Sequence, residues 1–571
     1  MWQAFGESKE GMGFLLYPFV AATLCITAVL VNRRRNLFMR RLKGPPTLSW
    51  LLGNEHLLLR QEQVGDLEYA WICEYGATFR ISSCYGRQSF FTADPRVVQH
   101  IVHTSGYRYG KRVDHTQSTR NVMGRGIVWA SGDVHKRHRK VMNPAFRTLE
   151  LRGFLPLFQG VASRMTSAWK DQIQSGDNKI NVTPWLARTA LDAIGGAAFN
   201  YQFGALDNAQ NELRMCLDNL FCDTLPSRPN WDILFKALWR YIPLPILQLV
   251  EYMPTKEYRR FRQFRNVCRS VAKQLITHNA SKMDTFPEVK PKRDLMNVLV
   301  RANASEDPKR QLDEDEVLSQ MGTIILAGHD TVAFTLSWML YELAKHPDDQ
   351  KRLRDEIRAL RTQIPANTTF TTADLESLPF TNAVIKEAMR LHPILPTLNR
   401  TAERDDTIPL ALPVVAADGR IVKELSVKRG QDFVISVSGY NRVSSVWGDD
   451  AGVWNPQRFL EMSKEKQTSV GVYANLMTFC KRTQIIVPLN ILISSRHRLV
   501  TMIAGGVRGC IGWQFALIEL QVLLVEMIEK FQVSLPEGVE ILRLPALFML
   551  PVVKGRRSEG TQMPLHVSLV E

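Results

Sequence analysis

The chain has 571 residues, 45% of them apolar and 22% charged, a composition that indicates a globular protein with a large core. Its formal net charge of +16 suits an acidic protein partner or an anionic membrane surface, and we expect no nucleic acid because no nucleic-acid motif with interleaved aromatic residues is present. The eight cysteines show no paired C-x-x-C spacing, which favours free thiols in a reducing compartment.

A long apolar stretch lies near the N-terminus. Residues 12–31 carry no charge, and six basic residues follow between positions 33 and 43. This length crosses the core of a bilayer, and the basic flank is retained on the cytosolic side. A cleaved signal peptide is the alternative, but it needs a charged region before the apolar run and a cleavage site after it. We expect residues 1–45 to form a single-pass transmembrane anchor in the endoplasmic reticulum membrane, with a lumenal N-terminus.

Residues 46–571 have the pattern of one predominantly α-helical domain with small peripheral β-sheets. Alternating apolar residues between positions 77 and 92 predict a β-hairpin. Apolar residues at three-to-four spacing predict helices at 151–173, 182–199, 267–278, 313–346 and 380–391. Short strands are expected at 408–415, 421–427 and 433–437.

Two of the helical patterns contain polar groups that core packing does not require. In the basic run 132–146, His135 and Arg139 lie one turn apart on the same face; a solvated surface is the alternative. Residues 321–338 are apolar on nearly all sides and predict a buried helix, yet Asp330 and Thr331 interrupt them. A purely structural account has Thr331 bonded to a carbonyl one turn earlier and Asp330 in a buried pair.

Glu387 and Arg390 share one face of the expected helix 380–391 at i, i+3 spacing. In isolation this is a surface ion pair worth roughly 0.2–0.5 kcal/mol.

Cys510 lies on a glycine-rich turn between Gly506 and Gly512, two residues after Arg508 and at the start of an apolar helical pattern. The neighbouring cation and the helix N-terminus both favour the thiolate, which is the form of cysteine that binds metal. A small buried cysteine without such a role is the alternative.

Together these elements resemble the cytochrome P450 monooxygenases, most closely those of fungi. The loop is similar to the haem-binding pattern F-x-x-G-x-R-x-C-x-G, except that Ile503 stands at the phenylalanine position. Residues 327–331, AGHDT, resemble the oxygen-activating helix motif A/G-G-x-D/E-T. Glu387 and Arg390 match E-x-x-R, and Arg458 matches the arginine of the P-x-R-F element.

The resemblance implies a cytochrome P450 fold that binds haem b, with Cys510 as the axial thiolate ligand of the iron and Arg508, Gly506 and Gly512 shaping the loop. Arg139 stands at the arginine of the family's W-x-x-x-R motif and would pair with a haem propionate. His135 replaces the tryptophan of that motif, and Arg400 is a second candidate propionate partner.

The same resemblance assigns roles to the buried helix and to the ion pair. Thr331 would direct a proton toward bound dioxygen, Asp330 would relay protons to it, and Gly328 would leave room at the haem face. Glu387, Arg390 and Arg458 would form a buried structural triad beside the haem loop.

The implied reaction inserts one oxygen atom from O2 into a lipophilic substrate, and the resemblance to fungal members of the family implies a step of secondary metabolism. Electrons would come from NADPH through a separate cytochrome P450 reductase, with cytochrome b5 as a second donor, because the chain has no flavin or nicotinamide fingerprint. Lys136, Arg137 and Lys140 are candidates for its docking surface. The expected substrate contacts are largely apolar: Met123, Ile127, Val128, Leu220, Phe221, Phe548 and Met549.

Residues 480–503 interrupt the haem-binding pattern. Phe479 ends a segment that resembles the approach to the loop, and deleting these 24 residues would complete the pattern. A tolerated surface loop is one interpretation, and a translated, unspliced intron is the one that we favour. Two alternatives to a monooxygenase follow: a haem-deficient or impaired membrane protein, and a P450-fold isomerase or dehydratase that needs no reductase. The Asp330–Thr331 pair argues against the second.

Overall fold

The computed structural model describes residues 37–207, 212–222, 228–285, 295–365, 368–461, 475–479 and 506–570. The expected membrane anchor at residues 12–31 and the interruption at 480–503 lie outside the described residues. Within the described ranges, one helix, Glu314–Lys345, is long and apolar enough to cross a membrane, and 83% of its apolar window is buried, as in a core helix.

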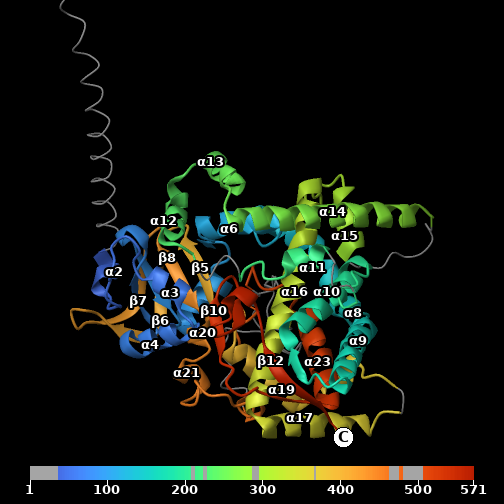
Figure 1. Ribbon diagram of the computed structural model, residues 1–571. Coiled ribbons are helices and arrows are strands. Elements are labelled where there is room, and N and C mark those ends of the chain that lie inside the picture. Colours follow the sequence, from blue (N-terminus) through green and yellow to red (C-terminus); the bar gives the residue numbers. More distant parts are fainter. Residues whose placement is uncertain are drawn as a thin grey trace, which may run out of the picture.

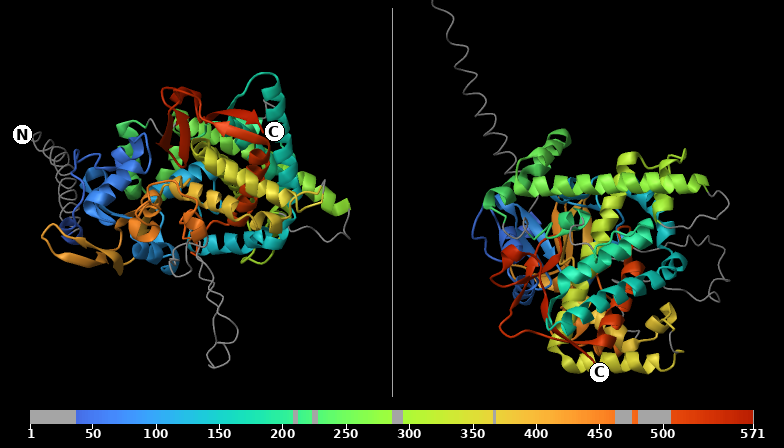
Figure 2. Two further views of the ribbon diagram at one scale, coloured as in Figure 1. Left: turned by 90° about the horizontal axis from the view of Figure 1, so that it is seen from below. Right: turned by 45° about the vertical axis from the view of Figure 1, so that its right-hand side comes forward.

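Long helices make up most of the body. They are α9 (Leu155–Gln174), α10 (Val182–Phe199), α14 (Lys256–Thr285), α16 (Glu314–Lys345), α17 (Pro347–Arg361), α19 (Pro379–Leu391) and α23 (Trp513–Lys530). Figures 1 and 2 show α14 across one end of the molecule and α17 across the opposite end, with α10, α16 and α23 between them.

Shorter helices complete this body. They are α2 (Leu37–Arg41), α3 (Glu55–Arg60), α4 (Asp66–Tyr75), α5 (Pro95–Gln99), α6 (Val113–Met123), α7 (Gly132–Met142), α8 (Thr148–Arg152), α11 (Glu212–Leu217), α12 (Asn230–Leu238), α13 (Leu244–Gln248), α15 (Leu295–Asn303), α18 (Thr372–Glu376), α20 (Val437–Tyr440), α21 (Ser444–Trp447) and α22 (Arg458–Glu461).

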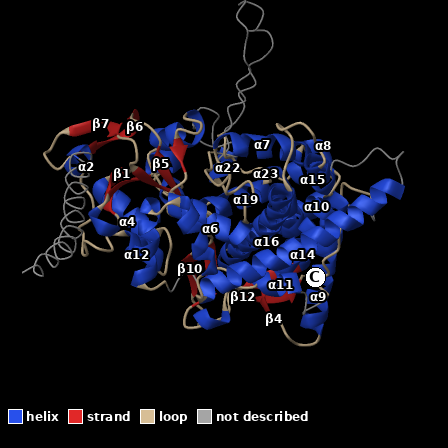
Figure 3. Ribbon diagram, turned by 90° about the horizontal axis from the view of Figure 1, so that it is seen from above, coloured by secondary structure: helices blue, strands red, loops and turns tan. Residues whose placement is uncertain are grey.

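The helix α16 is the centre of the core. Asp313 caps its N-terminus by accepting a hydrogen bond from the Glu316 N–H, and the Glu316 side chain accepts one in return from the Asp313 N–H. From there the helix is buried along most of its length, and it packs against α10, α14, α19 and α23. Figure 3 shows α16 surrounded by these helices.

The strands form small sheets at the edge of the helical body. The largest has the order β1 (Thr78–Ser82), β2 (Gln88–Thr92), β8 (Asp432–Ser436), β5 (Thr397–Ala402) and β3 (Tyr109–Gly110). The parallel β2–β8 pairing stacks the Phe90 and Phe433 rings, with centroids 4.8 Å apart. The smaller sheets pair β6 (Asp406–Val415) with β7 (Ile421–Val427), β10 (Ile541–Pro545) with β11 (Met549–Val553), and β12 (Pro564–Leu569) with β4 (Lys179–Asn181) and β9 (Phe531–Ser534).

The expected fold class, predominantly helical with small peripheral sheets, is confirmed. The prediction of one continuous helix over 151–173 is wrong, because α8 ends at Arg152 and α9 starts anew with a proline in its first turn. The prediction at 267–278 covered only part of α14, whose many basic residues obscure the apolar spacing.

Candidate functional site

The Cys510 loop lies directly before α23 and is held by backbone hydrogen bonds. The Gly509 N–H donates to the Gly506 carbonyl at 2.9 Å, and the Cys510 N–H donates to the Phe479 carbonyl at 2.9 Å. The Cys510 residue is exposed. Gly512 precedes α23 in open surroundings, since the nearest atom to a Cβ placed there would be Cε1 of Phe146 at 3.7 Å. The Cys510 thiol is therefore accessible just before the start of α23.

Phe479 lies beside the loop although it stands 30 positions before Gly509 in the sequence. Besides the hydrogen bond from Cys510, its ring centroid lies 6.5 Å from that of Trp513. Phe479 therefore contacts both Cys510 and Trp513, as a residue of the loop itself would.

Cationic side chains from separate elements surround the loop. Arg139 of α7 donates from Nη1 to the Gly509 carbonyl at 2.9 Å, and Arg508 donates from Nη1 to the Tyr109 carbonyl at 2.9 Å. Burial lowers the pKa of both guanidinium groups. Neither forms an ion pair within the part of the chain that the structure describes, and Nε of Arg508 is buried without a hydrogen-bond partner.

Lys111 joins this group, and the sequence analysis missed it. It follows β3 and donates from Nζ to the carbonyls of Val128 and Ala130, the latter at 3.0 Å. Burial, and then repulsion from Arg508 and Arg400, lowers the pKa of Lys111 to about 7. No periodicity marks this position; the only sequence signal is a lysine directly after a short strand of the main sheet.

His135 and Arg400 are placed at the edge of the same cationic group. Nδ1 of His135 lies 2.7 Å from the Tyr107 hydroxyl, and burial, followed by Lys111 and Arg139, lowers the pKa of His135 to about 3. The imidazole is therefore neutral at physiological pH. Arg400 lies on β5 and donates from Nη1 to the Asn399 carbonyl at 2.8 Å.

The middle of α16 departs from the buried pattern of the rest of the helix. Ala327, Gly328 and Thr331 are half-exposed between buried neighbours, as expected where a helix borders an internal space. The Thr331 hydroxyl donates to the Ala327 carbonyl at 2.7 Å. Oδ1 of Asp330 lies 2.7 Å from Nδ1 of His329, and both side chains are buried.

The role expected for Gly328 at a haem face stays a prediction, but this glycine also has a packing role that the sequence did not indicate. A Cβ on Gly328 would approach the Ile194 side chain of α10 to 3.0 Å. The missing side chain therefore allows α16 to pack closely on α10.

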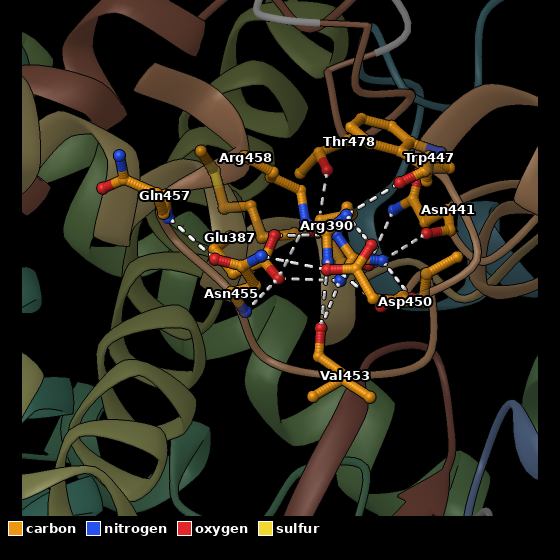
Figure 4. A network of polar contacts seen from close by, with 12 residues as sticks. Glu387, Arg390, Asn441, Trp447, Asp450, Val453, Asn455, Gln457, Arg458 and Thr478 are labelled. Atoms are coloured by element: carbon orange, nitrogen blue, oxygen red, sulfur yellow. Dashed lines mark hydrogen bonds and ion pairs between the residues drawn. The ribbon is translucent and has the colours of Figure 1, made fainter. Parts of the chain in front are cut away.

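Glu387, Arg390 and Arg458 meet in one buried network (Figure 4). Arg390 donates from Nε and Nη2 to the two Glu387 oxygens, both at 2.7 Å, and Arg458 donates from Nε to Oε1 of Glu387 at 3.2 Å. The backbone carbonyls of Asn441 and Val453 accept further hydrogen bonds from Arg390. The network ties α19 to the segment 441–458. Thr478, which precedes Phe479, donates to the Met389 carbonyl of α19.

The family model described as Cytochrome P450 matches residues 43–481 and 498–556. Cytochrome P450 monooxygenase 128 of Postia placenta is 32% identical over 93% of this chain and 92% of its own length. Cytochrome P450 monooxygenase claQ of Ampulloclitocybe clavipes is 28% identical over 93% of each chain. The chain belongs to the cytochrome P450 family. Its expected enzyme class, a cytochrome P450 monooxygenase and hence an oxidoreductase, is confirmed by these matches.

The cytochrome P450 family implies haem with a cysteine thiolate ligand, and the residues around Cys510 fit that group. Haem carries two propionate carboxylates, whereas Arg139 and Arg508 are desolvated cations whose hydrogen bonds go to neutral carbonyls. Lys111, with its pKa lowered to about 7, is a basic group that a nearby carboxylate would keep protonated. A buried cation without a counter-ion is costly, and a carboxylate supplies the missing partner.

The apolar residues expected at the substrate are mostly buried. Met123, Ile127, Leu220, Phe221, Phe548 and Met549 are buried, whereas Val128 is 41% exposed. Phe548 contacts both Phe221 and Phe334, with ring centroids 5.6 and 6.3 Å apart. These contacts join the segment after α11, the helix α16 and the β10–β11 turn in one apolar wall.

Proposed function

We propose that this cytochrome P450 is a haem-thiolate monooxygenase that oxidises a lipophilic substrate, with Cys510 as the axial ligand of haem b. The observation that carries the proposal is the position of Cys510, an accessible thiol at the start of α23 whose adjacent carbonyl accepts a hydrogen bond from Arg139. When bound, the haem supplies oxygen activation, and electron donation from a thiolate favours O–O bond cleavage.

The protein's own residues would hold the cofactor and control protons. Arg139, Arg508 and Lys111 supply cationic donors to the propionates, and His135 and Arg400 are placed beside them. Asp330 and Thr331 are adjacent on α16; a carboxylate next to a hydroxyl that borders the internal space suits proton transfer toward the substrate side. The triad Glu387–Arg390–Arg458 fixes α19 beside the loop.

The reduced carbon-monoxide difference spectrum of the full chain tests the thiolate ligand. We expect the Soret band of a thiolate-ligated haem in the native chain and in Cys73→Ala, which removes another exposed thiol. Cys510→Ala should lack this band. A thiolate band that persists in Cys510→Ala would exclude Cys510 as the ligand.

NADPH is the proposed electron source, through a separate cytochrome P450 reductase, with cytochrome b5 as an additional donor. Lys136 and Lys140 of α7 are exposed on the same helix that carries Arg139 and suit an acidic partner. Arg137 contributes less than the sequence suggested, because it pairs with the buried Glu316 of α16. Reductase-supported turnover that falls in Lys136→Glu/Lys140→Glu, with an unchanged carbon-monoxide spectrum, would support this surface.

Attachment to the endoplasmic reticulum membrane is proposed from residues 12–31 and from an exposed apolar patch. The patch comprises Trp231, Leu238, Tyr241, Leu244, Ile246, Leu249 and Tyr252, all between 39% and 68% exposed. Trp50, 63% exposed, adjoins it through Tyr85, whose hydroxyl donates to the Leu234 carbonyl. Figure 1 shows α12 and α13 projecting from one end of the molecule. Exposed tryptophan and tyrosine rings beside aliphatic residues suit a bilayer interface.

Lipid contact at this patch is measurable in vesicles that contain brominated lipids. The full chain should show quenching of tryptophan fluorescence that decreases in Trp231→Phe and is unchanged by Trp169→Phe, which removes a fully buried ring. Equal quenching in the native chain and Trp231→Phe would place α12 away from the lipid.

A second candidate, a cytochrome P450 impaired by the interruption at 480–503, is favoured by one observation. The family model matches up to residue 481 and resumes at 498, so the intervening residues have no counterpart in it. Sequencing the mature transcript tests the proposed unspliced intron, which is rejected if every message retains these codons.

A further inference from the structure

A cavity of about 200 Å³ is lined by residues of α10, α11 and α16, the helices that Figure 3 labels. One wall is apolar and consists of Leu220, Phe221, Phe334 and Leu550. It continues into the Phe221–Phe548–Phe334 ring contacts. The lining also includes His329 and Asp330 of α16 together with Arg188 of α10. The cavity thus combines an apolar surface with charged groups next to the proposed proton-transfer residues.

Arg188 differs from the other charged groups of this cavity. Arg214 pairs with Asp218 at 3.5 Å, Asp330 lies against His329, and Glu559 accepts a hydrogen bond from Gln562. Arg188 has no ion pair in the described part of the chain, and its Nε is buried without a hydrogen-bond partner. Its guanidinium lies 5.2 Å from the Trp185 ring, and burial, followed by Arg214, lowers its pKa. A carboxylate ligand would supply the missing counter-ion.

A second, outer depression of about 550 Å³ adjoins this cavity, and the two share Asn181 and Glu559 in their walls. Lys179, Lys554 and Arg556 line the outer depression. Lys554 pairs with Glu540 at 2.9 Å, whereas Lys179 is exposed at the start of β4. Glu540 and Glu559 also line this depression, and Glu559 lies 4.0 Å from Arg556. Among the described residues, Lys179 is therefore the cation of this lining without an ion pair, and it suits the approach of an anion.

We propose that the cavity binds the carboxylate of an amphipathic organic acid at Arg188, with its alkyl portion against Phe221 and Phe334. The inference rests on the proposed monooxygenase function and deepens it by naming the substrate class. The cavity volume of about 200 Å³ suits a carboxylate with a short alkyl chain. The carboxylate satisfies Arg188, and the chain buries apolar area against the aromatic wall.

Calorimetric titration of the full-length holoenzyme with octanoate and with octanol tests the proposal, because these ligands differ mainly in the charged group. Octanoate should bind about tenfold more tightly than octanol, as expected for a charge-assisted contact. Arg188→Gln should abolish this preference, and Arg188→Lys should retain most of it. Arg152→Gln, on the exposed surface of α8, is the matched control and should leave both affinities unchanged.

Equal affinity for the two ligands, or an octanoate preference that survives in Arg188→Gln, would overturn the proposal. Ala187→Phe is a second variant that introduces bulk into the cavity wall; it should weaken both ligands, and unchanged binding would also overturn the assignment. The carbon-monoxide spectrum distinguishes a failure of the proposed acid site from a failure of the proposed monooxygenase function. A thiolate band without octanoate preference rejects the acid site alone, whereas octanoate preference without that band rejects the monooxygenase and leaves the acid site.

Discussion

At the scale of single residues, buried charge is organised around Glu387. This carboxylate is fully buried and accepts hydrogen bonds from both Arg390 and Arg458. Arg390 is itself fully buried, so its guanidinium has no access to water. Removing the carboxylate therefore leaves two cations whose remaining partners are mainly neutral carbonyls and, for Arg458, Asp450.

Glu387→Ala should lower the free energy of unfolding by about 3–5 kcal/mol, which is the cost of removing one partner of a buried ion pair. Chemical denaturation of the chain measures this loss. Glu461→Gln, at an exposed position of α22, is the control and should change stability by less than about 0.5 kcal/mol. A loss as small as the control's would show that the network is not a stabilising element.

The lowered pKa of Lys111 predicts that the stability of the haem-free protein depends on pH. Its pKa in the folded state is lowered to about 7, whereas the pKa of a lysine in the unfolded chain is about 10.4. Between these values the unfolded chain binds more protons than the folded chain, so Lys111 makes stability rise with pH from about 7 to about 10.

Urea unfolding of the haem-free chain across this range should show a steeper rise in the native chain than in Lys111→Met. Lys140→Met, at an exposed position of α7, should keep the native slope; identical slopes in the native chain and Lys111→Met would contradict the prediction.

At the scale of elements, α10 and α16 pack closely at a position where α16 has no side chain. Gly328 faces Ile194 so closely that a Cβ would lie 3.0 Å from it. Gly328→Val should destabilise the fold by about 1–3 kcal/mol through overpacking. Ile194→Ala alone should cost about 2–5 kcal/mol through a cavity. The double variant should lose less than the sum, because the valine occupies the space that Ile194 leaves. Additive losses in thermal or chemical unfolding would show that the two side chains do not share that space.

Local patterns predicted the elements better than their mutual arrangement. The predicted helix 182–199 coincides with α10, and 313–346 exceeds α16 by one residue at each end, because apolar spacing and the Asp313 cap are local signals. The parallel β2–β8 pairing joins residues more than 340 positions apart, and no local signal specifies it. For the same reason the sequence did not reveal that Gly328 faces α10, or that Lys111 lies beside Arg508.

At the scale of the whole molecule, the loop around Cys510 is assembled from distant segments. Arg139 comes from α7, Lys111 from the sheet edge, and Phe479 from before the interruption. The pattern F-x-x-G-x-R-x-C indicated Phe479 as the missing residue of the loop, and the hydrogen bond from Cys510 places it there. The roles of Cys510, Asp330, Thr331 and the cationic residues toward haem stay predictions.

Deletion of residues 480–503 tests whether these residues lower the haem content of the protein. Loop length alone adds only about 0.6 kcal/mol for each doubling. A variant in which a glycine-serine linker of equal length replaces 480–503 should therefore bind haem nearly as well as the deletion variant.

The native insertion contains the apolar run 485–493, which has to be covered or left in water. We expect the native chain to have a lower haem-to-polypeptide ratio and a weaker thiolate band than either variant. Equal haem content in all three proteins would show that the insertion is tolerated, and a low content in the linker variant alone would show that the native residues contribute to the site.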